Sequence, residues 1–158
     1  MPVSIVDRPL RIGIFVQTFP RLSETFIVTK VLKLVDAGFD VQLFTLAEST
    51  DWDKFAVLAQ RDDIRARIHI APPLETSPRA LFAGARQIAA TAAAHPAAFA
   101  RFVAHTWRHR ETAPMRFWKS LYARTHFVGY ALDILHIEFD LQGVPFVDLK
   151  ELLGCRML

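Results

Sequence analysis

The feature that most constrains the fold of this chain is a strand, a polar turn, a helix and a second strand, all within its first third. A near-continuous apolar run predicts the first strand, Arg11–Phe19, because such runs are typical of parallel strands covered on both faces. An amphipathic helix follows and ends at Gly38, which suits the left-handed position just past a helix end. The strand Asp40–Leu46 completes a β-α-β unit, which predicts a parallel α/β sheet.

The rest of the pattern extends this sheet and inserts helices into it. We expect a short helix at Trp52–Gln60, a third strand at Arg67–Ile70 and a fourth at Asp133–Phe139. The predicted fold class is therefore α/β: a Rossmann-like parallel sheet flanked by helices, with a helical insertion before the fourth strand at about residues 78–130. The helices expected in the insertion are Arg79–Ala94, Ala97–Arg110 and one that Pro114 opens.

The length of the chain predicts one domain. Its 158 residues are enough for a real hydrophobic core and too few for two ordinary domains. A short helix at Val147–Leu153 precedes Cys155–Leu158, which we interpret as the start of a further strand. Because a crossover helix returns the chain to another parallel strand, we expect residues 1–158 to be a truncated domain. A short edge strand or a frayed tail is the alternative.

Composition narrows the function classes. The 52% hydrophobic content argues against disorder, and the single cysteine excludes an internal disulfide and fits a reducing cytoplasm. The start of the chain does not match a signal peptide, so we expect a cytoplasmic protein, peripheral on the inner face of the plasma membrane if it binds lipid. Neither a Walker loop nor GxGxxG is present, and no nucleic-acid module is visible, so nucleic acid is not an expected partner.

Positive charge gathers in the middle of the chain. The formal net charge is +3, yet residues 76–132 carry eight Lys or Arg and one acid, a local net of +7. Helices that combine Lys and Arg with Trp and Phe suit a membrane interface, so we expect the basic helices at 79–124 to contact an anionic membrane surface. The alternative is that the arginines are simply solvated and the aromatic residues belong to the core. In that interpretation one buried helix face would comprise Phe99, Phe102, Val103 and Trp107.

Polar residues at the carboxyl ends of strands are the first candidates for function, because ligands of parallel sheets bind at that edge. The turn Gln17–Glu24 lies there. His136 and Glu138 are two residues apart on the fourth strand and therefore point the same way, either as functional groups or as a structural pair. His105 and His109 are four apart on a helix, but no acidic ligand supports them, and a solvated helix face is favoured over a metal site.

Two segments resemble the amino-terminal domain of retaining glycosyltransferases of family four. The turn Phe19–Phe26, with the sequence FPRLSETF, looks like the pattern of the branch that builds bacterial exopolysaccharides, and a similar helix and strand follow it. The fourth strand is similar to the family's Asp-to-Phe segment through Asp133, His136 and Phe139. It departs from the family at Glu138, where a second histidine is usual, so a contact between that position and the donor sugar is in doubt.

The resemblance implies a B-type architecture, in which two Rossmann-like domains face a cleft. This chain would contribute the wall that binds a sugar or a lipid-linked acceptor. The domain that binds the nucleotide-sugar and carries the family's paired glutamates would be absent from it. The resemblance therefore implies neither a metal nor a cofactor, with a nucleotide-sugar as substrate of the complete enzyme, and little transfer by this chain alone.

The resemblance also implies roles for individual residues. Arg21 would hold the phosphate of a lipid-linked acceptor, or it is an exposed loop charge. Glu24 would bind a sugar hydroxyl or act as a base, or it complements the helix dipole. Ser23 is expected mainly as a helix N-cap. The catalytic candidates are His136, Glu138 and Glu24, and the acceptor-binding candidates are Thr18, Arg21, Ser23 and Thr25.

A second function class stays open on sequence grounds. The chain fits a non-catalytic Rossmann-like module that binds an anionic ligand, a partner or a membrane surface. The sequence does not decide whether the chain is itself an enzyme. A downstream domain with a Glu-x7-Glu pattern would favour the glycosyltransferase, whereas a stable protein ending at Leu158 would favour the module.

Overall fold

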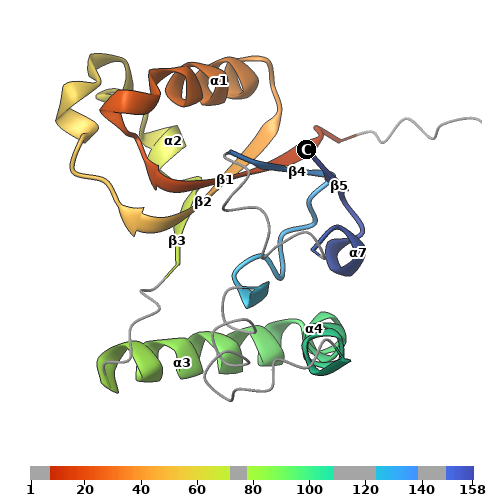
Figure 1. Cartoon of the computed structure of the whole chain (residues 1–158). Helices are drawn as coiled ribbons and strands as arrows, with labels where there is room; N and C mark the ends of the chain where they lie inside the picture. Colours follow the sequence, from red (N-terminus) through yellow and green to blue (C-terminus); the bar gives the residue numbers. More distant parts are fainter. Residues whose placement is uncertain (1–7, 72–77, 109–123, 139–148) are drawn as a thin grey trace, which may run out of the picture.

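Five parallel strands form one sheet in the order β3-β2-β1-β4-β5 (Figure 1). This computed structural model describes residues 8–71, 78–108, 124–138 and 149–158. The predicted parallel α/β fold is confirmed, and the first strand has the predicted bounds. The strands are β1 (Arg11–Phe19), β2 (Asp40–Glu48), β3 (Ile68–Ile70), β4 (Ile134–Ile137) and β5 (Arg156–Met157).

Helices cover both faces of this sheet, as Figure 1 shows with α1 on one side and α3 and α4 on the other. In the described part of the predicted insertion, two long helices lie between β3 and β4. The prediction at 52–60 was wrong in kind: two 3₁₀ turns, Trp52–Lys54 and Ala56–Leu58, lie there, and a short α-helix follows. The α-helices are α1 (Thr25–Asp36), α2 (Asp62–Arg65), α3 (Pro78–Ala94), α4 (Pro96–Arg108) and α7 (Leu149–Leu153).

The alternation of β1 separates two hydrophobic cores. Ile14 and Val16 face α1, where they pack with Ile27 and Val31 of that helix. Phe15 faces the opposite layer. Burying side chains of this size contributes about 1.5–3 kcal/mol each, so both layers are held by substantial apolar contact. The second core also contains Phe44, Phe102, Phe127, Leu135 and Leu149.

The start of α1 differs from the prediction. Ser23 is exposed and lies in a 3₁₀ turn, Leu22–Glu24, so it is not the N-cap. The N-cap position is Glu24, which makes no side-chain capping hydrogen bond. The prediction at the other end is confirmed, because Gly38 follows the helix with φ +87° and its N–H donates to the carbonyl of Val35.

One predicted helix face is corrected in part. Phe102 is buried on α4, and Phe99 and Val103 pack beside it. Trp107, which was expected on the same face, is 73% exposed, because its place on the helix turns it away from the sheet. The helix predicted to begin at Pro114 and the end of the fourth strand at Phe139 lie outside the described residues.

The connections define a switch point between β1 and β4. From β1 the chain crosses through α1 to β2 on one face of the sheet, whereas from β3 it crosses through α3 and α4 on the other face to reach β4 (Figure 1). Strands whose connections leave in opposite directions open a crevice at their carboxyl ends, where ligands of such sheets bind. The fold therefore directs attention to the ends of β1 and β4.

Candidate functional site

The turn after β1 lies at the surface and is fastened to the loop after β2. Arg21 and Ser23 are exposed, while Pro20 is buried. The hydroxyl of Ser49 donates to the carbonyl of Pro20, and the N–H of Leu22 donates to Oδ2 of Asp51 at 3.0 Å. The hydrogen bond and ion pair from Lys54, followed by the hydrogen bond from the N–H of Leu22, lower the pKa of the Asp51 carboxyl. The turn thus has a defined geometry although its side chains face water.

Within the turn, two candidate residues bind each other. Arg21 Nη1 lies 3.2 Å from Glu24 Oε1, at the i, i+3 spacing that brings side chains together. The pair leaves the Arg21 side chain half-exposed. Thr18 is half-buried and Thr25 is exposed. The turn therefore presents a partly neutralised arginine and small hydroxyls to the edge of the sheet.

His136 and Glu138 point the same way, as their spacing predicted. In register His136 pairs with Ile14, which faces α1, and the N–H of Glu138 donates to the carbonyl of Phe15. His136 Nε2 lies 3.1 Å from Glu138 Oε1. Both side chains therefore project from the carboxyl end of β4 toward the first half of α1.

A lysine that sequence reasoning overlooked completes this group, which we call the switch-point cluster: Lys30, His136 and Glu138. Lys30 Nζ donates to Glu138 Oε1 at 2.5 Å and lies 3.3 Å from His136 Nε2. Glu138 is buried, at 7% exposure, so the lysine supplies the counter-charge that a buried carboxylate requires. The available signal was position, since Lys30 is the sixth residue of the helix that follows β1.

The two contacts of His136 Nε2 require different tautomers of the ring. Toward Lys30 this nitrogen must accept, because an ammonium only donates; toward Glu138 it must donate, because a carboxylate only accepts. The ring nitrogen can satisfy one partner at a time. The tautomer of His136 therefore decides which of the two partners its Nε2 binds.

The described contacts do not join the turn to this cluster. The polar contacts of the turn go to Ser49 and Asp51, and those of His136 and Glu138 go to Lys30. A cavity of about 180 Å³ opens beside Phe19, lined by residues of β2, β3 and the loop between them, and neither His136 nor Glu138 lines it. The candidate residues thus form two groups at one edge of the sheet.

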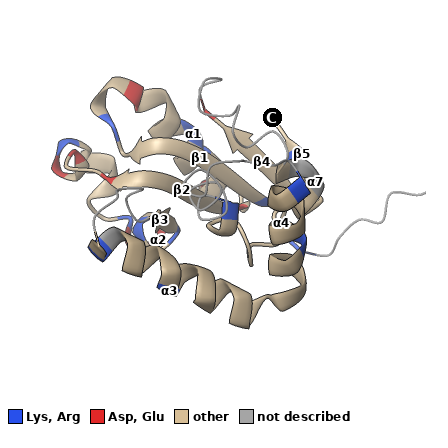
Figure 2. Cartoon of the chain, turned by 60° about the horizontal axis from the view of Figure 1, so that its bottom comes forward, with Lys and Arg blue, Asp and Glu red and all other residues tan. Residues whose placement is uncertain are grey.

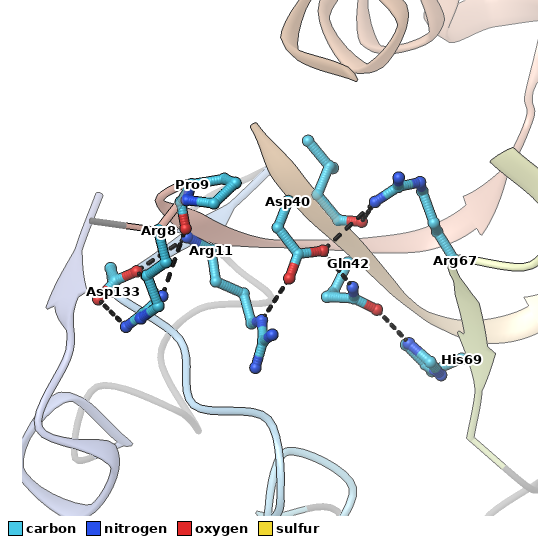
Figure 3. Close-up of polar contacts among 9 residues, drawn as sticks. Arg8, Pro9, Arg11, Asp40, Gln42, Arg67, His69 and Asp133 are labelled. Carbon is cyan, nitrogen blue, oxygen red and sulfur yellow. Dashed lines mark hydrogen bonds and ion pairs between the residues drawn. The ribbon is translucent and has the colours of Figure 1, made fainter. Parts of the chain in front are cut away.

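A second polar network, on the opposite face, was not predicted. Figure 3 shows it running along β2 to β3: Gln42 Nε2 donates to Asp40 Oδ1 at 2.7 Å, and His69 Nε2 lies 2.8 Å from Gln42 Oε1. The hydroxyl of Tyr130 lies 3.0 Å from His69 Nδ1. His126 Nε2 lies 3.0 Å from the carbonyl oxygen of His69. We call His69, His126 and Tyr130 the neutral-histidine cluster.

Burial sets the charge of this cluster. Burial lowers the pKa of His69 and that of His126, and it raises the pKa of the Tyr130 hydroxyl. Loss of water would raise the pKa of Asp40, but the hydrogen bonds from Arg11 and Gln42 outweigh it and the pKa is lowered. At neutral pH the network therefore combines an ionised aspartate with uncharged imidazoles and an uncharged phenol.

This cluster lies against a cavity of about 620 Å³. One wall is a single face of α3, made by Gln87, Ala90, Thr91 and Ala94, which recur at helical spacing. The other walls are the end of β3 and the segment at 126–130. The sequence carried a signal for this cluster, because His69 lies between two isoleucines in a strand as His136 lies between Leu135 and Ile137. Only His136 was predicted as a site residue.

Three other predictions concern a metal site, a membrane span and Asp133, which is part of the resemblance of the fourth strand. Within residues 8–71, 78–108, 124–138 and 149–158, no three His, Cys, Asp or Glu side chains are grouped as metal ligands; His109 lies outside these ranges. None of the helices in these ranges is both long enough and apolar enough to span a bilayer. Asp133 receives a two-pronged ion pair from Arg8 and the N–H of Arg11 at the opposite edge of the sheet (Figure 3), which is a structural role.

Comparison with known proteins does not assign the chain to a family. No protein family, no curated protein and no solved structure matches the chain. The function therefore has to be argued from the fold and from the side chains at the edge of its sheet.

Proposed function

We propose that this chain is the acceptor-side domain of a glycosyltransferase with B-type architecture. The observation that carries the proposal is the switch-point cluster, because it places a histidine, a buried carboxylate and a lysine at the β1–β4 boundary, where ligands of such sheets bind. The resemblance of the turn and of the fourth strand to family-four enzymes supports the same assignment. The nucleotide-sugar would bind a second domain of the complete enzyme.

In this proposal the three members of the cluster have different roles. His136 contacts a hydroxyl of the sugar, because its side chain is 29% exposed, against 9% for Glu138, and an imidazole can both donate and accept hydrogen bonds. Glu138 is a positioning residue, since its buried oxygen already accepts from Lys30 and orients the imidazole. The lysine also offsets the negative charge that this chain carries where the family usually has histidine.

The turn would form the rim of the acceptor site. Ser23, Thr25 and Thr18 offer short hydroxyls, which donate to and accept from sugar hydroxyls. Arg21 is half-exposed and could exchange Glu24 for an acceptor phosphate. Glu24 would then be released to accept a hydrogen bond from a sugar hydroxyl. Binding of an acceptor at the rim is thus coupled to the opening of one ion pair.

Binding is the direct test. Proton–nitrogen correlation NMR spectra of the whole chain are recorded with methyl glycosides of glucose, galactose, mannose and N-acetylglucosamine, and with farnesyl phosphate as a soluble lipid phosphate. At about 10 mM of each probe, a site worth about 4 kcal/mol is well occupied. We expect saturable shifts in the amides at 17–26 and 134–138 with at least one probe.

A matched pair of variants on α1 serves as the control. Lys30→Gln removes the counter-charge of Glu138 and should weaken binding about tenfold, the effect of losing a charge-assisted hydrogen bond worth about 1.4 kcal/mol. Lys33→Gln changes an exposed lysine of the same helix and should leave binding unchanged. Absence of shifts at both segments with every probe would contradict the proposal.

A second candidate function rests on the surface of α3 and α4. These helices carry Arg79, Arg86, Arg101 and Arg108 and no acidic residue, and Figure 2 shows the basic residues along them. Phe82 on α3 is 73% exposed. A basic face with an exposed aromatic ring suits a module that binds an anionic membrane surface.

Vesicle co-sedimentation distinguishes this candidate from the first. Binding to vesicles with phosphatidylglycerol, lost at about 0.5 M salt and reduced by Phe82→Ser, would support a membrane-surface module. If the same amount of protein sedimented with zwitterionic vesicles as with vesicles containing phosphatidylglycerol, at both low and high salt, electrostatic attachment through these helices would be excluded. Neither result alters the expected sugar-induced shifts at the β1–β4 boundary.

A further inference from the structure

The cavity beneath α3 has no part in the proposed function. It lies on the face of the sheet that carries Phe15 and Phe44, whereas the switch-point cluster lies on the face that carries Ile14. Its volume of about 620 Å³ falls in the range of small-molecule sites, about 300–1,000 Å³. What it would bind follows from the protons and charges of the residues that line it.

The hydrogen bonds fix the proton positions around the cavity. The carboxylate of Asp40 only accepts, so Gln42 turns its NH₂ toward it and its oxygen toward His69. His69 must therefore carry its proton on Nε2, which leaves Nδ1 to accept from the hydroxyl of Tyr130. His126 likewise donates from Nε2 to the carbonyl oxygen of His69, which leaves Nδ1 as an acceptor.

The lining of the cavity therefore offers a ligand two hydrogen-bond acceptors and two groups that can both donate and accept. The oxygen of Tyr130 keeps its lone pairs after donating its proton, and His126 keeps the lone pair on Nδ1. On the facing wall, Thr91 has a hydroxyl and Gln87 an amide, and each of these both donates and accepts. A ligand that matches this lining must donate hydrogen bonds to Tyr130 and His126. Toward α3 it can both donate and accept hydrogen bonds.

Charge excludes the usual anions and cations. Among the described residues, those that line the cavity include no Lys, Arg, Asp or Glu. Burial keeps His69 and His126 uncharged at neutral pH, since it lowers the pKa of both. In the described lining a phosphate or carboxylate would find no Lys or Arg, and an ammonium would find no carboxylate. The described lining therefore favours an uncharged ligand.

Flat heterocycles fit the cavity less well than compact polyols. The ring of Tyr130 packs edge-on against Phe44, with centroids 5.0 Å apart, and lies 4.4 Å from His69, so its neighbours within the protein occupy it. On the facing wall, α3 contributes the small aliphatic side chains of Ala90 and Ala94. C–H groups pack against such a wall, whereas a nucleobase prefers an open aromatic face.

Gly129 lets the ring of His95 lie against the segment at 126–130. Its φ of +96° belongs to the left-handed region that side chains avoid, and a Cβ there would lie 2.5 Å from His95 Nε2. A larger residue would push His95, another lining residue, out of place. The local backbone thus requires glycine at this position of the lining.

We propose that this cavity binds an uncharged, hydroxyl-rich ligand of mono- or disaccharide size. Hydroxyls of the ligand donate to the oxygen of Tyr130 and to Nδ1 of His126, and they exchange hydrogen bonds with Thr91 and Gln87. The proposal goes beyond the acceptor site and does not rest on it. The two sites lie on opposite faces of the sheet, so each can be tested without the other.

The test uses the whole chain at neutral pH with glucose, galactose, mannose, maltose and sucrose as probes, and adenosine and inorganic phosphate as contrasting ligands. Proton–nitrogen correlation NMR spectra should show saturable shifts in the amides at 87–94 and 126–130 with at least one sugar. The contrasting ligands should cause none there. No sugar shifting these amides, or stronger shifts with adenosine or phosphate, would overturn the proposal.

Matched variants separate ligand binding from folding. Ala90→Phe fills the cavity from an exposed position on α3 and should weaken binding at least tenfold, whereas Ala89→Phe, one residue away and outside the lining, should not. Should Ala90→Phe fail to give a folded spectrum, Ala94→Phe replaces it. Unchanged affinity in a folded cavity-filling variant would refute the site. Glu138→Gln should leave these shifts intact, so the acceptor site can fail while this one stands.

Discussion

Strands β3 and β4 each carry a histidine between two aliphatic residues, and the sheet gives the two histidines opposite surroundings. His69 pairs in register with Phe44, whose side chain packs under α3, and its partners are an amide and a phenol. His136 pairs with Ile14, whose side chain packs under α1, and its partners are a carboxylate and an ammonium. One half-buried histidine is uncharged among neutral groups, and the other half-buried histidine belongs to a charged cluster.

Register parity accounts for this difference. Side chains of a strand alternate between the two faces, so a shift of one residue in pairing would exchange the environments of the two histidines. The helix that covers each face then decides the chemistry: α1 brings Lys30 to His136, whereas the segment after α4 brings Tyr130 to His69. Similar local sequences therefore acquire different chemical surroundings through the layer that they face.

Phe44→Ala is expected to have the largest effect, because it removes the ring that supports the neutral-histidine cluster. Phe44 is fully buried and contacts the rings of His69, His126, Phe127 and Tyr130. We expect a loss of about 3–5 kcal/mol in the free energy of unfolding, measured by urea denaturation.

Two further variants sharpen the Phe44 result. Ile14→Ala, on the other face, should also destabilise the protein by about 2–5 kcal/mol, yet leave the NMR titration of His69 and His126 unchanged. Phe26→Ala, at a half-exposed position, should change stability by less than about 1 kcal/mol. If Ile14→Ala altered the titration of His69, the two faces would not be independent.

Glu138→Gln tests the charged side of the comparison. It leaves Lys30 without its carboxylate partner. Breaking a fully buried pair costs about 3–5 kcal/mol, but Lys30 is 36% exposed and can turn to water, so we expect a loss of about 1–2 kcal/mol.

The effect of Glu138→Gln on the free energy of unfolding is measured by urea denaturation, with Lys33→Gln as the control. Because Lys33 is exposed, its substitution should change the free energy of unfolding by less than about 0.5 kcal/mol. The urea midpoint should shift while its slope stays constant. Equal effects of Lys33→Gln and Glu138→Gln would mean that the switch-point cluster does not hold the β1–β4 boundary together.

The fold followed from the sequence because its signals are local and strong. The apolar run of β1, the periodic face of α1 and Gly38 each depend on neighbouring residues, so the β-α-β unit and its parallel sheet could be predicted. The start of α1 could not, because the choice between Ser23 and Glu24 as N-cap was decided by contacts with the loop after β2, through Ser49 and Asp51.

The candidate sites were predictable only in part. The spacing of His136 and Glu138 placed both on one face of a strand, which needs no tertiary information. Lys30 and Tyr130 reach their histidines from positions 106 and 61 residues away, and such long-range contacts leave no pattern in a single sequence. The uncharged state of His69 depends on burial by those distant segments, so it too was out of reach.

Acidification should weaken the neutral face first. The pKa of His69 and that of His126 lie below the ordinary value of 6.5 because of burial, so the unfolded chain binds more protons than the folded one once the pH falls below that value. Stability is therefore complete above about pH 6.5 and declines as the pH falls toward the folded-state pKa values, by at most about 1.4 kcal/mol per group and pH unit.

Melting temperatures between about pH 7.5 and 5 measure this decline, because the aspartates with lowered pKa values lose their stabilising effect only at lower pH. His126→Gln keeps an N–H donor for the carbonyl of His69 and removes one titrating group, so its melting temperature should fall less steeply. A profile unchanged by this variant would show that the histidine is not the group that binds the proton.

Thr45→Val is expected to have the smallest effect and the opposite sign. Thr45 is fully buried on β2, and among the described residues its Oγ1 is the buried side-chain oxygen without a hydrogen-bond partner. It pairs in register with Val16 and Ile70, whereas Gln42 of the same strand satisfies both ends of its amide. An unpaired buried hydroxyl costs about 1–3 kcal/mol, and a methyl group of similar shape avoids that cost, so we expect a gain of about 1 kcal/mol in the free energy of unfolding, measured by urea denaturation.

Thr29→Val, which removes an exposed hydroxyl bonded to the carbonyl of Thr25, should change stability by less than about 0.5 kcal/mol. A loss of stability on Thr45→Val would mean that this hydroxyl has a partner and that polar pairing in β2 extends to both faces of the sheet.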